Sequence, residues 1–270
     1  MGKRLAVAVL IAAALVCGRP AAADKLILGN EGTYPPFSIL DPSGKLTGFE
    51  PELARAMCER MKADCDIVAM DFKALIPSLM AGKLDAVVSQ ITPTPSRVGH
   101  MLFTMVIIQN DYSFVVPADS HYTFTKEGLK GMRMGLVNGG ATSKFIMDTF
   151  GDSIVPVWYD NMVQVKLELL SGRIDATFGA RINWRLDLID TPEGKGWKLD
   201  DKQYWLGDPN LPEPERGLSW ITRLGNEALI ERMNKALASL IEDCTYTKIR
   251  DRFIKFPILP AEAHCLKPSG

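Results

Sequence analysis

An internal repeat constrains the fold of this chain more than any other feature of its sequence. The segment Leu79–Ala86 matches Leu169–Ala176 in register, ninety positions later. Each copy reads as a helix end, a glycine, a basic residue and an Asp-Ala pair that enters a strand. Ninety residues is far longer than a solenoid period. The repeat predicts two lobes of similar design, although such helix-glycine-strand joints are also common in other α/β folds.

Strand and helix patterns alternate along the chain. Lys25–Asn30 and Ile67–Met70 read as short apolar strands, and a helical pattern begins at Pro51. Ala74–Met80 reads as a short helix that Gly82 closes. This alternation predicts an α/β protein with mostly parallel sheets.

The second lobe is predicted from a strand and a linker. Met132–Val137 reads as its strand, and Gly207–Gly217 is rich in Pro and Gly, as a linker should be. Leu218–Thr222 and Glu227–Ile241 then read as a strand and a helix that return to the first lobe. The predicted limits are 24–111 with 208–263 for the first lobe, 112–207 for the second lobe and 264–270 for a C-terminal tail.

Residues 1–23 have the order of a secretory signal peptide. Lys3 and Arg4 precede an apolar run that ends at Val16, and three alanines precede Asp24. A run of about a dozen apolar residues is too short to span a bilayer. Lipid attachment at Cys17 is the alternative, but lipoprotein processing needs a small residue before the cysteine. We expect cleavage before Asp24 and a periplasmic product.

Composition excludes several classes of protein. Removal of the predicted leader reduces the 31 Lys and Arg residues to 28, against 32 Asp and Glu, so the mature 247 residues carry a net charge of −4. A net negative chain without a basic block is a poor candidate for nucleic-acid binding. Hydrophobic residues make up 47% of the sequence, which excludes disorder. We expect a soluble monomer.

The mature chain keeps four cysteines, Cys58, Cys65, Cys244 and Cys265. An even number in an exported protein favours disulfides, and proximity in sequence favours Cys58–Cys65 and Cys244–Cys265 among the three possible pairings. Four unpaired thiols are the alternative. We expect no metal site, because no Cys-x-x-Cys occurs and the three histidines are scattered.

Signatures of catalysis and of cofactor binding are missing from the sequence. The chain has no Gly-x-Ser-x-Gly, Gly-x-x-x-x-Gly-Lys-[Ser/Thr], His-Glu-x-x-His or Gly-x-Gly-x-x-Gly motif. We therefore expect no cofactor. Acid–base catalysis by carboxylates stays open, since sequence spacing does not show which acids converge.

One loop carries groups suited to an anion. Thr94 before Pro95 reads as a helix N-cap, which would place Arg97 in the first helical turn. Backbone N–H groups at a helix start, nearby hydroxyls and an arginine fork suit a carboxylate. The alternative interpretation makes Arg97 a solvated surface charge.

Four segments occur in an order that is typical of one family. They are Asn30–Phe37, Leu46–Ala54, Asp71–Leu79 and Gly82–Ala86. They resemble bacterial periplasmic polar amino-acid-binding proteins, the receptors of ATP-driven importers of the lysine/arginine/ornithine- and histidine-binding type. Cys58 and Cys65 fall where that family has its disulfide. The resemblance covers nearly the whole mature chain.

The resemblance implies a two-lobed clamp of the type II periplasmic binding protein fold, with two hinge crossovers. An amino acid would lie between the lobes. Tyr34 and Phe72 would sandwich its side chain, and Glu31 would face a cationic end group, with Glu50 as a weaker candidate.

The same resemblance implies partners for the rest of the ligand. Arg97 would be the charge partner of the α-carboxylate. The first-lobe residues that would surround this carboxylate are Ser89, Gln90 and Thr92. The second-lobe turn that would add hydrogen bonds contains Gly140, Ala141, Thr142 and Ser143.

One position departs from the family. The family usually has an aspartate shortly after the second-lobe strand, where it pairs with the ligand's α-ammonium. This chain has Ala180 there, between Gly179 and Arg181. A buried ammonium without a counter-charge costs on the order of several kcal/mol. The departure implies a nitrogen-substituted ligand with a second carboxylate, as in the opine-binding branch; the alternative is that Glu31 or another acid takes over the ammonium.

The function expected from the sequence is binding of a small ligand without catalysis of any reaction. The chain would be the substrate-binding component of an ABC importer, delivering a small polar amino acid or derivative to a membrane permease. An enzyme resembling cyclohexadienyl dehydratase on the same fold is the alternative, with Arg181 and either Glu31 or Glu50 in the cleft. A sensor module of a receptor kinase is disfavoured, since no membrane anchor follows Phe253.

Overall fold

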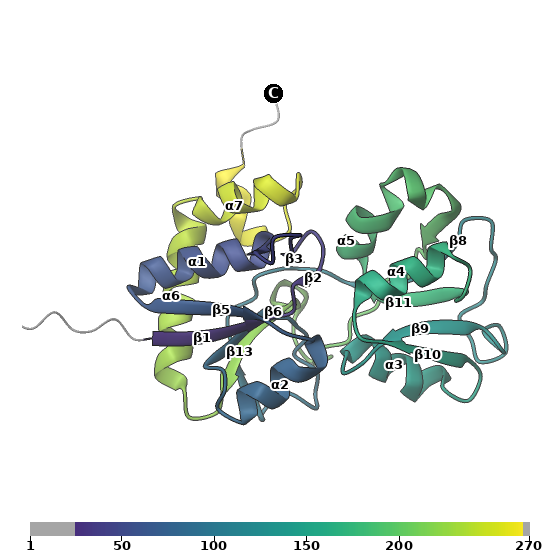
Figure 1. The fold of residues 1–270 in the computed structure, drawn as a ribbon, viewed down its shortest axis with the longest axis horizontal. Coiled ribbons are helices and arrows are strands. Elements are labelled where there is room, and N and C mark those ends of the chain that lie inside the picture. The colour runs from purple at the N-terminus through teal and green to yellow at the C-terminus, as the bar shows by residue number, and fades with distance from the viewer. Residues whose placement is uncertain (1–24, 267–270) are drawn as a thin grey trace, which may run out of the picture.

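The computed structural model describes residues 25–266 and has two lobes, each built on a five-stranded sheet (Figure 1). The predicted signal peptide and the last four residues of the predicted tail lie outside the described residues. Within the described part, no helix is long and apolar enough to cross a bilayer.

The sheet of the first lobe draws strands from both ends of the chain. In spatial order these are β5 (Asp64–Ala69), β1 (Lys25–Asn30), β6 (Ala86–Ile91), β13 (Ser219–Arg223) and β7 (Met101–Phe103). β1 pairs in parallel with β5 and β6, whereas β13 is antiparallel to β6 and β7. Four of the five strands therefore run in the same direction, and β13 returns to the first lobe as predicted.

Helices cover both faces of this sheet (Figure 1). They are α1 (Phe49–Met61), α2 (Phe72–Met80), α6 (Glu227–Glu242) and α7 (Thr245–Phe253). Successive residues of a strand point to opposite faces. Accordingly, Val87 of β6 packs with Leu75 and Leu79 of α2, whereas Val88 packs in the core beneath α1 and α6. A small sheet of β2 (Thr33–Tyr34), β3 (Ser38–Leu40) and β4 (Leu46–Thr47) adjoins α1.

The second lobe repeats this plan with the middle of the chain. Its sheet has the order β10 (Val155–Tyr159), β9 (Arg133–Val137), β11 (Ala176–Ala180), β8 (Tyr112–Pro117) and β12 (Trp197–Leu199). β8 alone runs against the others. Its helices are α3 (Ala141–Phe150), α4 (Met162–Leu170) and α5 (Arg181–Trp184). Shorter helical turns of this lobe are η1 (Arg185–Ile189) and η2 (Pro192–Gly196). Outside it, η3 (Glu213–Glu215) follows the second lobe in the chain, and η4 (Pro260–Cys265) packs against α6 and α7.

The sequence repeat corresponds to the same joint in both lobes. Gly82 and Gly172 follow α2 and α4 with φ angles of 73° and 69°, which favour glycine. Asp85 and Asp175 then each accept a 2.8 Å hydrogen bond from a backbone N–H of the neighbouring strand, β1 or β9. The prediction of two lobes of similar design is confirmed.

Two chain segments connect the lobes and lie side by side. The backbone N–H of Leu218 donates to the carbonyl of Ile108 at 2.8 Å. Tyr112 and Tyr204 pair in the same way farther along. Because a pair of adjacent crossovers restrains twisting more than bending, this arrangement is suited to a hinge.

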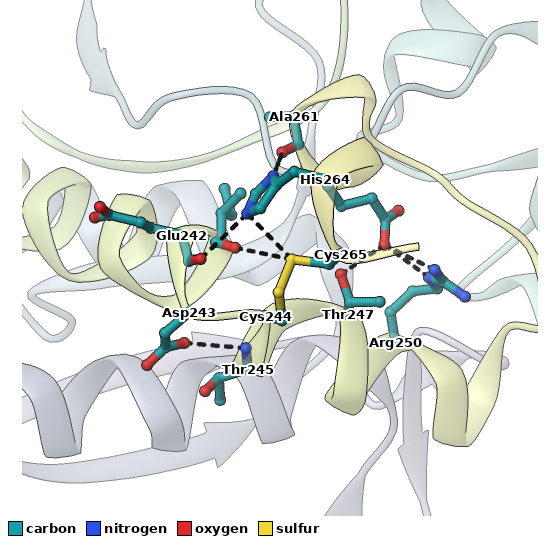
Figure 2. Close-up of a disulfide and its surroundings, with 11 residues drawn as sticks. Glu242, Asp243, Cys244, Thr245, Thr247, Arg250, Ala261, His264 and Cys265 are labelled. Atoms are coloured by element: carbon teal, nitrogen blue, oxygen red, sulfur yellow. Dashed lines mark hydrogen bonds and ion pairs between the residues drawn. A yellow bond between two sulfur atoms is a disulfide. The ribbon is translucent and has the colours of Figure 1, made fainter. Parts of the chain in front are cut away.

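Both predicted disulfides are confirmed. Cys58–Cys65 joins α1 to β5, and Cys244–Cys265 joins the end of α6 to η4 (Figure 2). Beside the second bridge, the buried Glu262 accepts two hydrogen bonds from the guanidinium of Arg250, at 2.8 and 3.0 Å. These contacts fix the end of the described chain on the first lobe.

Candidate ligand-binding site

A cavity that is partly open to solvent lies where the two lobes face each other. It sits at the carboxyl ends of β1, β6, β9 and β11, the edge at which open α/β sheets bind ligands. Its lining residues are Glu31, Tyr34, Phe72, Gln90, Thr92, Arg97, Tyr112, Val137, Gly140, Ala141, Thr142, Met162, Ala180 and Leu218. Ten of the fifteen residues expected at the site are among them.

Two buried carboxyl groups mark one end of the site. Glu31 follows β1, and its backbone N–H donates to the Ser89 hydroxyl at 3.0 Å. Burial raises the pKa of the Glu31 carboxyl to about 8. Glu50 lies at the start of α1, and burial together with the nearby Glu31 raises its pKa well above the usual range. Below pH 8 Glu31 is therefore mainly a neutral acid.

Three polar atoms at this end have no hydrogen-bond partner among the described residues. They are Oε2 of Glu50 and both side-chain atoms of Gln90. The other oxygen of Glu50 accepts a 3.1 Å hydrogen bond from the indole of Trp220. Buried polar groups are normally paired, so the amide of Gln90, which lines the cavity, needs a ligand or water as its partner.

Arg97 provides the positive charge of the cavity. Its guanidinium donates to the Thr92 carbonyl at 3.2 Å and to the Gly139 carbonyl, on the other lobe, at 3.4 Å. Burial lowers the pKa of Arg97, and the nearby Tyr112 opposes this shift. The group is fixed from both lobes and can still offer donors to an anion.

The expected helix around Arg97 is absent, and that prediction is wrong. Residues 95–97 form a turn, in which the backbone N–H of Arg97 donates to the Thr94 carbonyl at 2.8 Å. The turn ends because Val98 pairs with Met101 and Gly99 has a φ of 84°. The helix starts that border the cavity are instead those of α2 in the first lobe and of α3 and α4 in the second.

The second lobe contributes the first turn of α3. Gly140 is its N-cap, and Ala141 and Thr142 line the cavity. The first N–H groups of a helix have no partner within the helix and favour negative charge. Ser143, expected to bind ligand, instead donates to the Val137 carbonyl at 2.6 Å and secures this turn.

Hydroxyl groups cluster beside Ala180. The hydroxyls of Thr92 and Tyr112 lie 2.5 Å apart. The backbone of Ala180 in the second lobe acts on the pKa of Tyr34 from the first lobe, so the two lie close together. Burial raises the pKa of both tyrosines, so they stay neutral. Glu31 and Glu50 also raise the pKa of Tyr34, so carboxyl groups lie near the position at which the family has an aspartate.

Besides Ser143, four expected site residues do not line the cavity. Glu50 lies beyond Glu31, in contact with Trp220. The Ser89 hydroxyl accepts a hydrogen bond from the backbone N–H of Glu31 and does not face the cavity. Gly179 packs so closely on Trp184 that a Cβ would lie 2.2 Å from its indole nitrogen. Arg181 points to the hinge, where it donates to the Asp200 carbonyl at 2.6 Å.

Sequence reasoning missed four lining residues: Tyr112, Val137, Met162 and Leu218. Val137 ends a predicted strand, so the carboxyl-edge rule could have found it. Tyr112 and Leu218 belong to the crossovers, whose place beside the cavity depends on how the lobes pack. No sequence pattern around Met162 indicates that this residue lines the cavity.

Within the described residues, the cluster of potential metal ligands is Cys244, His264 and Cys265. Both sulfurs belong to the disulfide, as Figure 2 shows, so neither is available as a thiolate.

Comparisons with known proteins agree with this geometry. Arginine-binding protein 1 of the ABC transporters of Escherichia coli K12 is 34% identical over 235 residues, covering 86% of this chain and 91% of that protein. The lysine/arginine/ornithine-binding periplasmic protein of the same organism is 31% identical, covering 94% and 97%. A solved ancestral arginine-binding protein bound to arginine superimposes with a TM-score of 0.75 at 28% identity, covering 87% of this chain and all of that one.

The family assignment rests on a match over most of the chain. Residues 26–256 match the family as a whole, from β1 to the loop after α7. The two-lobed α/β architecture agrees with this match. The chain therefore belongs to the bacterial extracellular solute-binding proteins, family 3.

Proposed function

We propose that the protein is the periplasmic substrate-binding component of an ABC importer. It captures a small polar amino acid or amino-acid derivative between its lobes and delivers it to a membrane permease. Relatives named for binding arginine, lysine, ornithine and histidine support this proposal. We keep 24–111 with 208–263, and 112–207, as the proposed limits of the two lobes.

One observation carries the ligand class: a buried acid and a fixed guanidinium line the same cavity. Arg97 binds the carboxylate of the ligand, helped by the first N–H groups of α3. Glu31 meets a cationic group at the other end, after losing its own proton. Tyr34 and Phe72 contact the aliphatic part between the two ends. A basic amino acid or a derivative of one has this order of groups.

The relatives named above are binding proteins of transport systems. We propose that this chain likewise captures its ligand without changing it. A dehydratase on this fold would need a buried acid such as Glu31, so this proposal has to be tested directly. We expect no product on incubation with prephenate or arogenate, and turnover of either would contradict the proposal.

A thermal-shift screen over basic, neutral and acidic amino acids and their derivatives tests the ligand class. A ligand at 100 times its dissociation constant stabilises the folded state by about 2.7 kcal/mol, which raises the melting temperature by roughly 5–10 °C for a protein of this size. We expect this shift with compounds that carry a carboxylate and a distal cation, and none with glutamate. The variant Arg97→Ala is the matched control and should lose the shift.

A further inference from the structure

The disulfide Cys244–Cys265 lies beside a histidine, away from the ligand cavity (Figure 2). Both cysteines are half-buried, and His264 is exposed. Nε2 of His264 lies 3.2 Å from Sγ of Cys265. A ring nitrogen that can donate a hydrogen bond therefore adjoins one sulfur of a partly exposed bridge.

The surroundings of the imidazole assign a proton to Nε2. This nitrogen faces two acceptors, the Glu242 carbonyl at 3.1 Å and Sγ of Cys265. Nδ1 faces one acceptor, the Ala261 carbonyl at 3.1 Å. A neutral imidazole has a single N–H, whereas the charged ring has two. Nε2 carries a proton in the charged ring and in the neutral tautomer that satisfies more acceptors, so His264 donates toward Cys265.

A donor at this place stabilises one product of disulfide cleavage. When a thiolate attacks a disulfide, one of the two sulfurs is displaced as a thiolate, and a better-stabilised thiolate leaves faster. A histidine beside a sulfur favours its thiolate form. Cys265 is therefore the leaving group, and Cys244 is the sulfur that a nucleophile attacks.

The other bridge, Cys58–Cys65, is held in regular structure. Cys58 is 5% exposed and lies in α1, and Cys65 lies in β5. Within the described residues, no histidine lies beside its two sulfurs as His264 lies beside the second bridge. Cys244, in contrast, has a φ of 65°, which is unfavourable for a residue with a Cβ. Strained and exposed bridges are the ones that thiols reduce most readily.

We propose that Cys244–Cys265 is a redox-sensitive bridge that a dithiol opens by thiol–disulfide exchange. A thiolate of the dithiol attacks Sγ of Cys244, the bond between the two sulfurs breaks, and its electron pair leaves on Sγ of Cys265. This thiolate accepts the Nε2–H hydrogen bond of His264 and then takes a proton from water. The second thiol of the reductant displaces Cys244 from the mixed disulfide. The dithiol has then lost two electrons and two protons, and the bridge has gained them as two thiols.

Opening the bridge removes the covalent link between the end of α6 and η4. The contacts of η4 that remain include the two hydrogen bonds from Arg250 to the buried Glu262. Neither cysteine lines the ligand cavity. Reduction should therefore lower the melting temperature of the protein and leave its ligand affinity unchanged.

Reduction of the full mature protein by dithiothreitol, a dithiol, tests the proposal under conditions in which the protein stays folded. Samples are alkylated at intervals, and mass spectrometry gives the fraction of each bridge that has opened. We expect Cys244–Cys265 to open at least about tenfold faster than Cys58–Cys65. Equal rates, or faster opening of Cys58–Cys65, would overturn the proposal.

Two substitutions test the part played by His264. His264→Ala removes the donor and should slow the opening of Cys244–Cys265 at least about threefold, with the rate at Cys58–Cys65 unchanged. His264→Gln keeps an N–H donor and should restore part of the rate. If the imidazole only held η4 in place, its loss would loosen η4 and speed the opening. A faster or unchanged rate in His264→Ala would therefore overturn the proposal.

A monothiol identifies the sulfur that is attacked. Glutathione can form the mixed disulfide but has no second thiol of its own to resolve it. We expect the glutathione adduct on Cys244 and a free thiol, open to alkylation, at Cys265. An adduct mainly on Cys265 would overturn the assigned direction of attack and the role of His264 with it.

Discussion

The hydroxyl groups of Thr92 and Tyr112 lie 2.5 Å apart and join the two lobes beside the cavity. Thr92 follows β6 of the first sheet, whereas Tyr112 begins β8 of the second. The hydrogen bond joins a residue of the first sheet to one of the second. It therefore favours the arrangement in which both lobes can contact a ligand.

Removing this hydroxyl should weaken binding without disturbing the core. Tyr112→Phe keeps the ring that stacks on Phe178 and loses the bond to Thr92. A neutral hydrogen bond contributes about 1 kcal/mol, so we expect roughly three- to tenfold weaker binding by titration calorimetry. Tyr122→Phe, at an exposed position, is the control and should leave affinity unchanged. Equal affinity in both variants would show that the contact does not support closure.

Arg97 should be the residue whose loss affects binding most. We expect Arg97→Ala to abolish detectable binding and Arg97→Lys to retain a small part of it, because lysine keeps the charge and lacks the planar, paired donors. Calorimetry measures both, and Arg173→Ala, at an exposed arginine that does not line the cavity, is the control. Near-native affinity in Arg97→Ala would make Arg97 a surface charge, the alternative that its sequence context left open.

The raised pKa of Glu31 predicts that a cationic ligand displaces a proton. In the empty site this pKa is about 8, so the carboxyl is protonated at neutral pH and must ionise to pair with a cation. Affinity for such a ligand should rise with pH and level off above about 8. Calorimetry at pH 7 in buffers of different ionisation enthalpy should detect proton release, which Glu31→Gln should abolish.

The raised pKa of Glu31 also determines whether the stability of the ligand-free protein rises or falls with pH. The unfolded chain has the ordinary glutamate pKa of 4.5, below the folded value of about 8. Between these values the folded state binds more protons than the unfolded state, so stability falls as pH rises. Denaturant titrations at pH 5 and pH 8 should show this decrease in wild type and a smaller one in Glu31→Gln. A rise in the wild type that is absent from the variant would contradict the assignment.

Contacts across the cleft predict closure on binding. Lys73 of α2 donates to Asp160 of the second lobe at 2.6 Å, and Arg97 reaches the Gly139 carbonyl. Small-angle scattering should show a smaller radius of gyration with ligand than without it. Lys73→Ala removes an exposed ion pair and should weaken binding less than about fivefold. An unchanged scattering profile at saturation would count against the clamp.

Local patterns predicted the elements because their causes are local. Gly82 and Gly172, with the aspartates that follow them, allowed the helix-to-strand joint of both lobes to be predicted. Residues that follow parallel strands make up much of the cavity lining and could be predicted for the same reason. The helix at Arg97 was wrong because Thr94 and Pro95 suit a turn as well as a helix start. Tyr112 was missed because its place beside Ala180 depends on strand pairing across 68 residues.

The disulfide between Cys244 and Cys265 should stabilise the fold without affecting ligand binding. It closes a loop with a sequence separation of 21 residues and holds η4, with the buried pair Glu262 and Arg250, against α6 and α7 (Figure 2). Loop-closure entropy predicts a loss of about 3 kcal/mol in Cys244→Ser/Cys265→Ser, measured by urea unfolding. Cys244→Ala/Cys265→Ala controls for the added hydroxyls. Because this region does not line the cavity, affinity should stay at the wild-type value, and a large loss of binding at full folding would contradict the separation of the two sites.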